Sequence, residues 1–212
     1  MTSERVTHAL YELANWRNGL AFRNINFSEC GKPIIKIAEL KNGITDQTKF
    51  TMDEFDGSVA LSKGDMLFSW SGNPETSIDV FYYDLPDGWL NQHIFKVTPR
   101  DIDGSFLFYI LKYLKPTFTA ISSNKQTTGL GHVTVRDLKE LQVQIPPRSV
   151  QTKIAGILSS FDDRIYINAK INHHLASSKS ATGNSPDIRR GKRVSRSAAR
   201  RAFSFELLRM AS

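Results

Sequence analysis

A change of repeat at the dipeptide Pro146-Pro147 constrains this chain more than any other feature of its sequence. After the prolines, with Ser149 as the expected N-cap, apolar residues and asparagines recur at alternating intervals of four and three, the seven-residue repeat of a coiled coil. The repeat comprises Ile154, Leu158, Phe161, Ile165, Asn168, Asn172 and Leu175. The two asparagines would lower the stability of such a seam but can fix its register and its partner. We therefore predict a coiled-coil arm over residues 148–178; a helix that packs on its own domain is the alternative.

Before the prolines, short runs rich in Ile, Val, Phe and Tyr alternate with turn signals. These runs predict strands at residues 33–38, 65–70, 78–83, 89–98 and 141–145, separated by clusters of Gly, Pro, Asn and Asp. Residues 104–115 show helical spacing instead, and Pro116 is expected to end that helix. Strands mixed with few helices predict an α+β domain with a mixed sheet over residues 1–147.

The net charge of +7 is confined to the end of the chain. Residues 176–212 hold nine of the 28 Lys and Arg residues but two of the 21 Asp and Glu residues, so residues 1–175 carry nineteen of each and are neutral. A basic segment this poor in apolar residues cannot bury enough surface to offset the entropy of ordering, and we predict that residues 179–212 are mostly disordered. Any DNA binding by the folded part must rest on specific side chains rather than on net charge.

Common catalytic and cofactor signatures are missing from the sequence. It contains no glycine-rich phosphate loop, no nucleophile elbow and no cluster of metal-ligating His and Cys residues. Asp101 with Asp137 and Lys139 matches a nuclease pattern only in its letters. The one cysteine, Cys30, the short apolar stretches and the lack of a signal sequence lead us to expect no membrane contact and a cytoplasmic location.

Polar residues with interleaved aromatics gather at residues 69–73, 91–93 and 122–132. Asn, Gln, Ser, Thr and Lys are the side chains that read base edges in DNA grooves and contact phosphates. The same residue types also form ordinary turns, so composition alone leaves both interpretations open.

Six stretches of the chain, at residues 18–22, 31–45, 64–72, 88–97, 125–132 and 145–172, resemble those of a known family in the same order. The chain is similar to one half of a specificity subunit of a type I restriction-modification system, with one target recognition domain and one spacer helix. This resemblance implies a non-catalytic subunit that reads half of a bipartite site in double-stranded DNA and docks methylation and restriction subunits. It further implies that S-adenosylmethionine, ATP and Mg²⁺ bind to those partner subunits, with no catalytic residue, metal or cofactor on this chain.

The resemblance and the polar loops together select the candidate site residues. For DNA contact they are Lys41, Asn42, Ser69, Trp70, Ser71, Gly72, Lys125, Gln126, Thr127, Thr128 and His132. The heptad positions named above become helix-pairing residues, because the resemblance implies that spacer helices pack as an antiparallel pair. One recognition domain would then require a second copy of the chain or another specificity subunit.

Two departures from the family pattern keep other interpretations open. A full specificity subunit carries two recognition domains and two spacer helices, whereas this chain has one of each. Beyond Leu175 the family's Leu-, Gln- and Ala-rich helix gives way to a basic sequence, as a frameshift or a truncated gene would produce. The alternatives are an inactive truncated remnant and a stand-alone DNA nuclease or methyltransferase with an unrecognised site.

Overall fold

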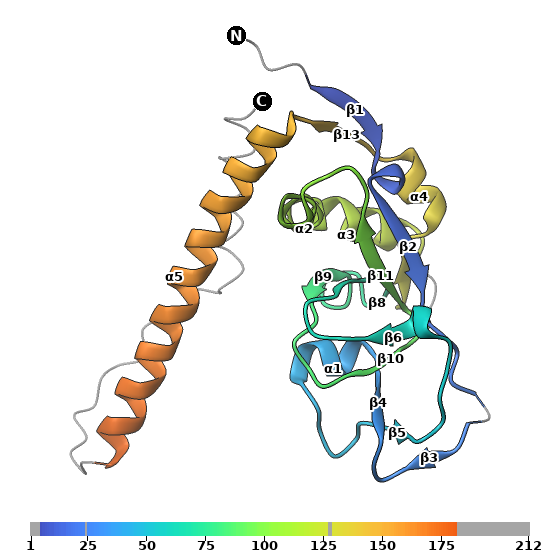
Figure 1. Ribbon diagram of the computed structural model, residues 1–212, viewed down its shortest axis with the longest axis vertical. Coiled ribbons are helices and arrows are strands. Elements are labelled where there is room, and N and C mark those ends of the chain that lie inside the picture. The colour runs from blue at the N-terminus through green and yellow to red at the C-terminus, as the bar shows by residue number, and fades with distance from the viewer. Residues whose placement is uncertain (1–4, 24, 127–128, 182–212) are drawn as a thin grey trace. The chain divides into compact units, whose positions relative to one another are not determined.

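The computed structural model describes residues 5–23, 25–126 and 129–181 (Figure 1). The chain divides into two compact units, and the first ends at Gln151. This first unit mixes short helices with parallel and antiparallel strand pairs, so the predicted α+β class is confirmed. In the described part of the chain, no helix is long and apolar enough to cross a membrane.

A four-stranded antiparallel sheet forms the centre of the first unit. Its order is β2 (Ala14–Asn18), β11 (Ile94–Pro99), β7 (Met66–Ser69) and β9 (Asp79–Tyr82). All four residues of β7 are buried, as expected for a central strand covered on both faces. Two of the strands, β7 and β9, lie within the runs predicted at residues 65–70 and 78–83.

Two consecutive helices follow this sheet. Asp103 caps α2 (Gly104–Tyr113) by accepting a hydrogen bond from the Phe106 backbone N–H at 3.0 Å. The chain then continues into α3 (Lys115–Asn124), in which Pro116 occupies the first turn. Proline is tolerated there because that N–H has no helical partner. The helix predicted at residues 104–115 ends as expected just before Pro116, but a second helix that we did not predict begins there, and residues 122–124, which we expected in a loop, complete it.

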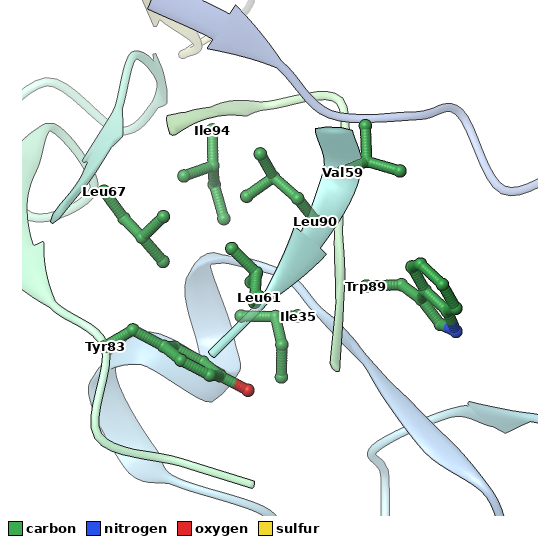
Figure 2. Packing of buried hydrophobic residues seen from close by; sticks show 8 residues of the cluster. All are labelled: Ile35, Val59, Leu61, Leu67, Tyr83, Trp89, Leu90 and Ile94. Carbon is green, nitrogen blue, oxygen red and sulfur yellow. The ribbon is translucent and has the colours of Figure 1, made fainter. Parts of the chain in front are cut away.

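The second sheet has five short strands in the order β3 (Phe27–Ser28), β5 (Phe50–Thr51), β4 (Lys32–Ile35), β10 (Gly88–Leu90) and β6 (Ala60–Leu61). A hydrophobic core joins it to the four-stranded sheet, since Leu67 and Ile94 of that sheet pack with Ile35, Leu61 and Leu90 of this one. Figure 2 shows their side chains pointing toward one another, with Trp89 at one side of the cluster. The two sheets therefore share one core.

The single strand predicted at residues 89–98 is instead two strands, β10 and β11, joined by a turn at residues 91–93. The apolar pattern runs through both strands, but each belongs to a different sheet. Gly19 makes the close crossing beside this turn possible, because a Cβ there would lie 2.3 Å from the Leu90 carbonyl oxygen. The polar residues 91–93 therefore lie where the chain passes from one sheet to the other.

Short elements complete the unit: η1 (Leu10–Leu13), α1 (Ile37–Asn42), η2 (Gly57–Val59) and α4 (Val135–Glu140), together with the pair β8 (Ser71–Gly72) and β12 (Gly131–His132). The first strand, β1 (Val6–Ala9), pairs antiparallel with the last, β13 (Gln142–Ile145), as Figure 1 shows. Gln151 is buried, donates to the Pro146 carbonyl at 2.8 Å and accepts from the Asp103 N–H at 2.9 Å. The Gln151 side chain thus binds the first turn of the last helix to Pro146 and Asp103 of the first unit.

That helix, α5 (Arg148–Ala181), is continuous over 34 residues and confirms a long helix in the stretch where we predicted the arm. Of its side chains up to residue 175, six large apolar ones are exposed: Ile157, Ile165, Tyr166, Ile167, Ile171 and Leu175.

Candidate nucleic-acid interface

The end of β7 places Trp70 at the junction of three segments. Its backbone N–H donates to the His93 carbonyl at 3.3 Å, and its own carbonyl accepts from the Val133 N–H at 2.8 Å. The indole Nε1–H donates to Asn18 Oδ1 at 3.1 Å. Trp70 is thus held by the turn before β11, by the end of β12 and by the end of β2.

Two imidazoles pack against the Trp70 indole. The ring centroids of His93 and His132 lie 5.7 and 5.8 Å from that of Trp70. Ser71 Oγ lies 2.9 Å from His132 Nδ1, across the β8–β12 pair. We call Asn18, Trp70, Ser71, His93 and His132 the Trp70 cluster; both imidazoles and the indole are half-buried and reach the surface.

The His93 imidazole of the Trp70 cluster is uncharged at neutral pH. Burial lowers the pKa of His93, and the neighbouring His132 lowers it further. Its Nε2 lies 3.2 Å from Gln92 Nε2, whereas its buried Nδ1 has no hydrogen-bond partner among the described residues. The exposed amide of Asn18 and the half-buried rings carry donors and acceptors, which is the chemistry of base-edge recognition, whereas the Ser71 hydroxyl is buried and positions His132.

Four of the predicted DNA-contacting residues come together here: Trp70, Ser71, Gly72 and His132. Gly72 has a φ of 120°, and a Cβ at this position would lie 2.7 Å from Ser77 Cβ, so the turn requires glycine. Ser69 is placed differently, because its hydroxyl is fully buried and bonds the Ser77 and Asp79 carbonyls. In this structure Ser69 fixes β7 to β9.

The other predicted DNA-contacting residues lie on separate elements. Lys41 and Asn42 are exposed at the end of α1. Lys125 follows α3 and forms an ion pair with Asp137, while Gln126 is exposed beside it. Thr127 and Thr128 lie outside the described residues.

Sequence reasoning left out Asn18, Gln92 and His93. The signal for the last two was visible, since the polar run at residues 91–93 interrupts an otherwise apolar stretch. We placed that run inside a strand, where alternate side chains point to opposite faces. The turn instead brings His93 against Trp70, and Asn18 reaches the cluster from a strand 52 residues away in sequence.

The Lys125–Asp137 ion pair, which joins the end of α3 to α4, makes the stability of the domain depend on pH. Burial alone raises the pKa of Asp137, but hydrogen bonds from Lys125 and Thr134 outweigh it and hold the pKa below its usual range. The stabilisation is therefore fully present above the unfolded pKa of about 3.9 and is lost as the pH falls through the lower pKa of the folded state.

We expect Asp137→Asn to lower the free energy of unfolding by about 1–3 kcal/mol at pH 7, because the variant cannot form this buried charged hydrogen bond. The cost should shrink when urea unfolding is repeated near pH 3, because the unfolded carboxylate, with its pKa of about 3.9, then takes up a proton and favours unfolding of the wild type. Asp46→Asn, at an exposed aspartate, is the matched control and should change stability little at either pH. An equal cost of Asp137→Asn at both pH values would contradict this assignment.

The predicted helix-pairing residues all lie on α5, and several are exposed. Ile165, Asn168, Asn172 and Leu175 are exposed, whereas Ile154 and Phe161 are half-buried and Leu158 is buried. Gly156 and Ser159 lie on the face away from this heptad seam. Over the part of the chain that the structure describes, no three His, Cys, Asp or Glu side chains gather as a set of metal ligands.

Known proteins share this sequence pattern and this fold. The family model "Type I restriction modification DNA specificity domain" matches residues 3–177. The MjaVIII specificity subunit of a type I restriction enzyme from Methanocaldococcus jannaschii is 29% identical over 136 residues, which cover 63% of this chain and 29% of that protein. The putative MjaX specificity subunit of the same organism is 28% identical over 158 residues, 70% of this chain and 37% of that protein.

Among solved structures, the S subunit of a type I restriction-modification system from M. genitalium is similar, with a TM-score of 0.58 and 20% identity. That similarity covers 82% of this chain and 44% of the M. genitalium chain. The chain therefore spans about a third of the curated relatives and less than half of this solved one.

Proposed function

The chain belongs to the type I restriction modification DNA specificity family, and from this we propose that it reads one half of a bipartite DNA site through the Trp70 cluster. Specificity subunits of these systems are non-catalytic DNA-recognition subunits. The observation that carries the proposal is the Trp70 cluster itself, in which polar donors and acceptors from four separate segments meet in a domain without excess positive charge. Such groups distinguish base pairs in the major groove, whereas they contribute little to sequence-blind attraction.

We further propose that α5 is a pairing helix. Its exposed apolar side chains stand beside two asparagines at seam positions, which suits a register-specific contact with another spacer helix. At about three heptads, one such contact is a marginal dimeriser by itself, so methylation subunits would strengthen it. A two-fold pairing of two copies makes the recognised sequence an interrupted palindrome.

The partner subunits complete the proposed complex. A methylation subunit and a restriction subunit would carry S-adenosylmethionine, ATP and Mg²⁺, and this chain would supply sequence recognition alone. We place the complex in the cytoplasm, where bacterial and archaeal DNA is accessible.

The deciding experiment is methylome sequencing of a strain that carries the partner subunits, with and without this gene. We expect a methylated bipartite motif that appears only when the gene is present. Absence of any motif would favour the truncated remnant. Methyl transfer from labelled S-adenosylmethionine, or Mg²⁺-dependent plasmid cleavage, by the purified chain alone would favour the stand-alone enzyme.

A further inference from the structure

Lysines from two helices converge on one carboxylate at the start of β9. Lys112 Nζ lies 2.8 Å from Asp79 Oδ1, and Lys115 Nζ forms an ion pair with Oδ2. A third lysine, Lys41 at the end of α1, lies within their electrostatic reach. Partial burial and then the charge of Lys115 lower the pKa of Lys41, whereas the charge of Asp79 raises it. Two ammonium groups thus pair with one carboxylate, and a third lies within reach of their charges.

The charge of this cluster is not balanced. Burial alone raises the pKa of Asp79, but Lys112 and Lys115 outweigh it and hold the pKa below its usual range, so the carboxylate stays ionised at neutral pH. The three lysines and Asp79 then carry two positive charges in excess. Residues 1–147 carry no excess of Lys and Arg over Asp and Glu, so this local excess of positive charge is a distinct point of attraction for an anion.

The two central ammonium groups are also held in place. The side chains of Lys112 and Lys115 are only 35% and 28% exposed, unlike freely moving surface lysines. Lys112 Nζ lies 5.4 Å from the Phe81 ring centroid and 5.5 Å from that of Phe108, within cation–π range. Groups that are already ordered lose less conformational entropy when a ligand binds.

This cluster is joined directly to the Trp70 cluster. Asp79 is the register partner of Ser69, the residue before Trp70. A Cβ at Gly72, two residues after Trp70, would lie 3.9 Å from Ile37 Cδ1, so the same turn lies close to α1, the helix that carries Lys41. Asp79, which binds Lys112 and Lys115, thus lies across the sheet from the residue that precedes Trp70.

We propose that Lys41, Lys112 and Lys115, with Asp79 as a positioning residue, form a clamp for a phosphodiester of the DNA backbone. This inference rests on the proposed function, because it assumes that a duplex lies against the Trp70 cluster. The clamp supplies sequence-independent attraction and fixes the register of the duplex, while the Trp70 cluster discriminates between bases.

The test compares two double variants of the full chain with equal charge changes. The clamp variant, Lys41→Gln with Lys115→Gln, removes two of the three positive charges and keeps the ion pair between Lys112 and Asp79. Lys63→Gln with Lys139→Gln removes two lysines elsewhere, of which Lys63 is exposed and pairs with Asp84. Affinity for a mixed-sequence duplex is measured over a range of salt concentrations, after thermal unfolding has shown that each variant folds.

We expect the clamp variant to flatten the slope of log K against log salt by about 0.9, the contribution of the one phosphate that it no longer neutralises, and the control variant to leave it nearly unchanged. Equal slopes in the two double variants would overturn the clamp. So would a clamp variant that loses affinity for inorganic phosphate but keeps the wild-type slope with the duplex.

The clamp and the proposed function can fail separately in this design. If the clamp variant keeps the wild-type salt slope while Trp70→Ala loses sequence preference, the clamp is wrong and the reading function stands. If the clamp variant flattens the slope while no form of the protein prefers any sequence, the clamp stands and the reading function is wrong.

Discussion

Replacing Trp70 with alanine is expected to remove most of the sequence preference of this protein. The indole holds Asn18 through a 3.1 Å hydrogen bond and supports both His93 and His132, so its loss disorganises several proposed readers at once. A single base-reading contact contributes about 1–3 kcal/mol of discrimination. The preference for the half-site found by methylome sequencing over a scrambled duplex should therefore fall at least about tenfold. Competition binding with the two duplexes measures this ratio directly.

Trp16→Ala provides a matched control for this experiment. Trp16 is half-buried like Trp70 and packs on the same Phe95 ring, but its indole N–H donates to the Tyr11 carbonyl instead of a polar cluster. Both substitutions leave a cavity beside Phe95, so both should lower stability. Only Trp70→Ala should change the preference between the duplexes. A similar loss of preference in both variants would show that the effect comes from damage to the sheet rather than from the cluster.

Introducing Ile165→Asp together with Ile171→Asp is expected to abolish assembly and, with it, methylation of a bipartite site. The two side chains are 39% and 49% exposed, so aspartates there meet water in the single chain and leave its fold intact. In a paired helix the carboxylate at seam position 165 would be buried without a partner and the one at position 171 would lie at the edge of the seam; burial of an unpaired ion costs several kcal/mol. Light scattering of the chain with its methylation subunit should fall from two copies of this chain per complex to one.

The control for assembly places the same two charges on the other face of α5. Gly156→Asp with Ser159→Asp alters exposed positions away from the heptad seam, and nothing lies within 4 Å of the position that a Cβ at Gly156 would occupy. This variant should assemble and methylate as the wild type does. Methylation of a bipartite site by the Ile165→Asp, Ile171→Asp variant would mean that the exposed face of α5 is not a pairing surface.

The fold class and the long helix could be predicted because each depends on local pattern. The run at residues 66–69 is apolar up to its final serine, and the heptad repeat begins directly after two prolines, so sequence spacing alone identifies a buried strand and a long helix. The continuation of helix beyond Pro116 was missed because Ser- and Thr-rich sequence has weak helix propensity. Tertiary packing stabilises this helix instead, since its residues Phe118 and Ser122 are buried.

The candidate site was predicted in part for a similar reason. Trp70, Ser71 and Gly72 are adjacent in sequence, so one polar loop identified them together, and His132 joins them through the β8–β12 pair. Asn18 and His93 reach the cluster through a change of sheet that leaves no periodic trace in the sequence. The convergence of Lys112 and Lys115 on Asp79 spans more than thirty residues and is likewise invisible without the fold.

The pairing of β1 with β13 has a consequence for how the domain is made. Val6 lies opposite Ile145, so the first strand remains without its neighbour until nearly the whole domain has left the ribosome. At about 5–20 residues per second, this wait is on the order of ten seconds. Throughout this interval, β1 offers a free edge to other nascent chains, and a contact so distant in sequence forms slowly. The domain is therefore completed by the pairing of its two ends.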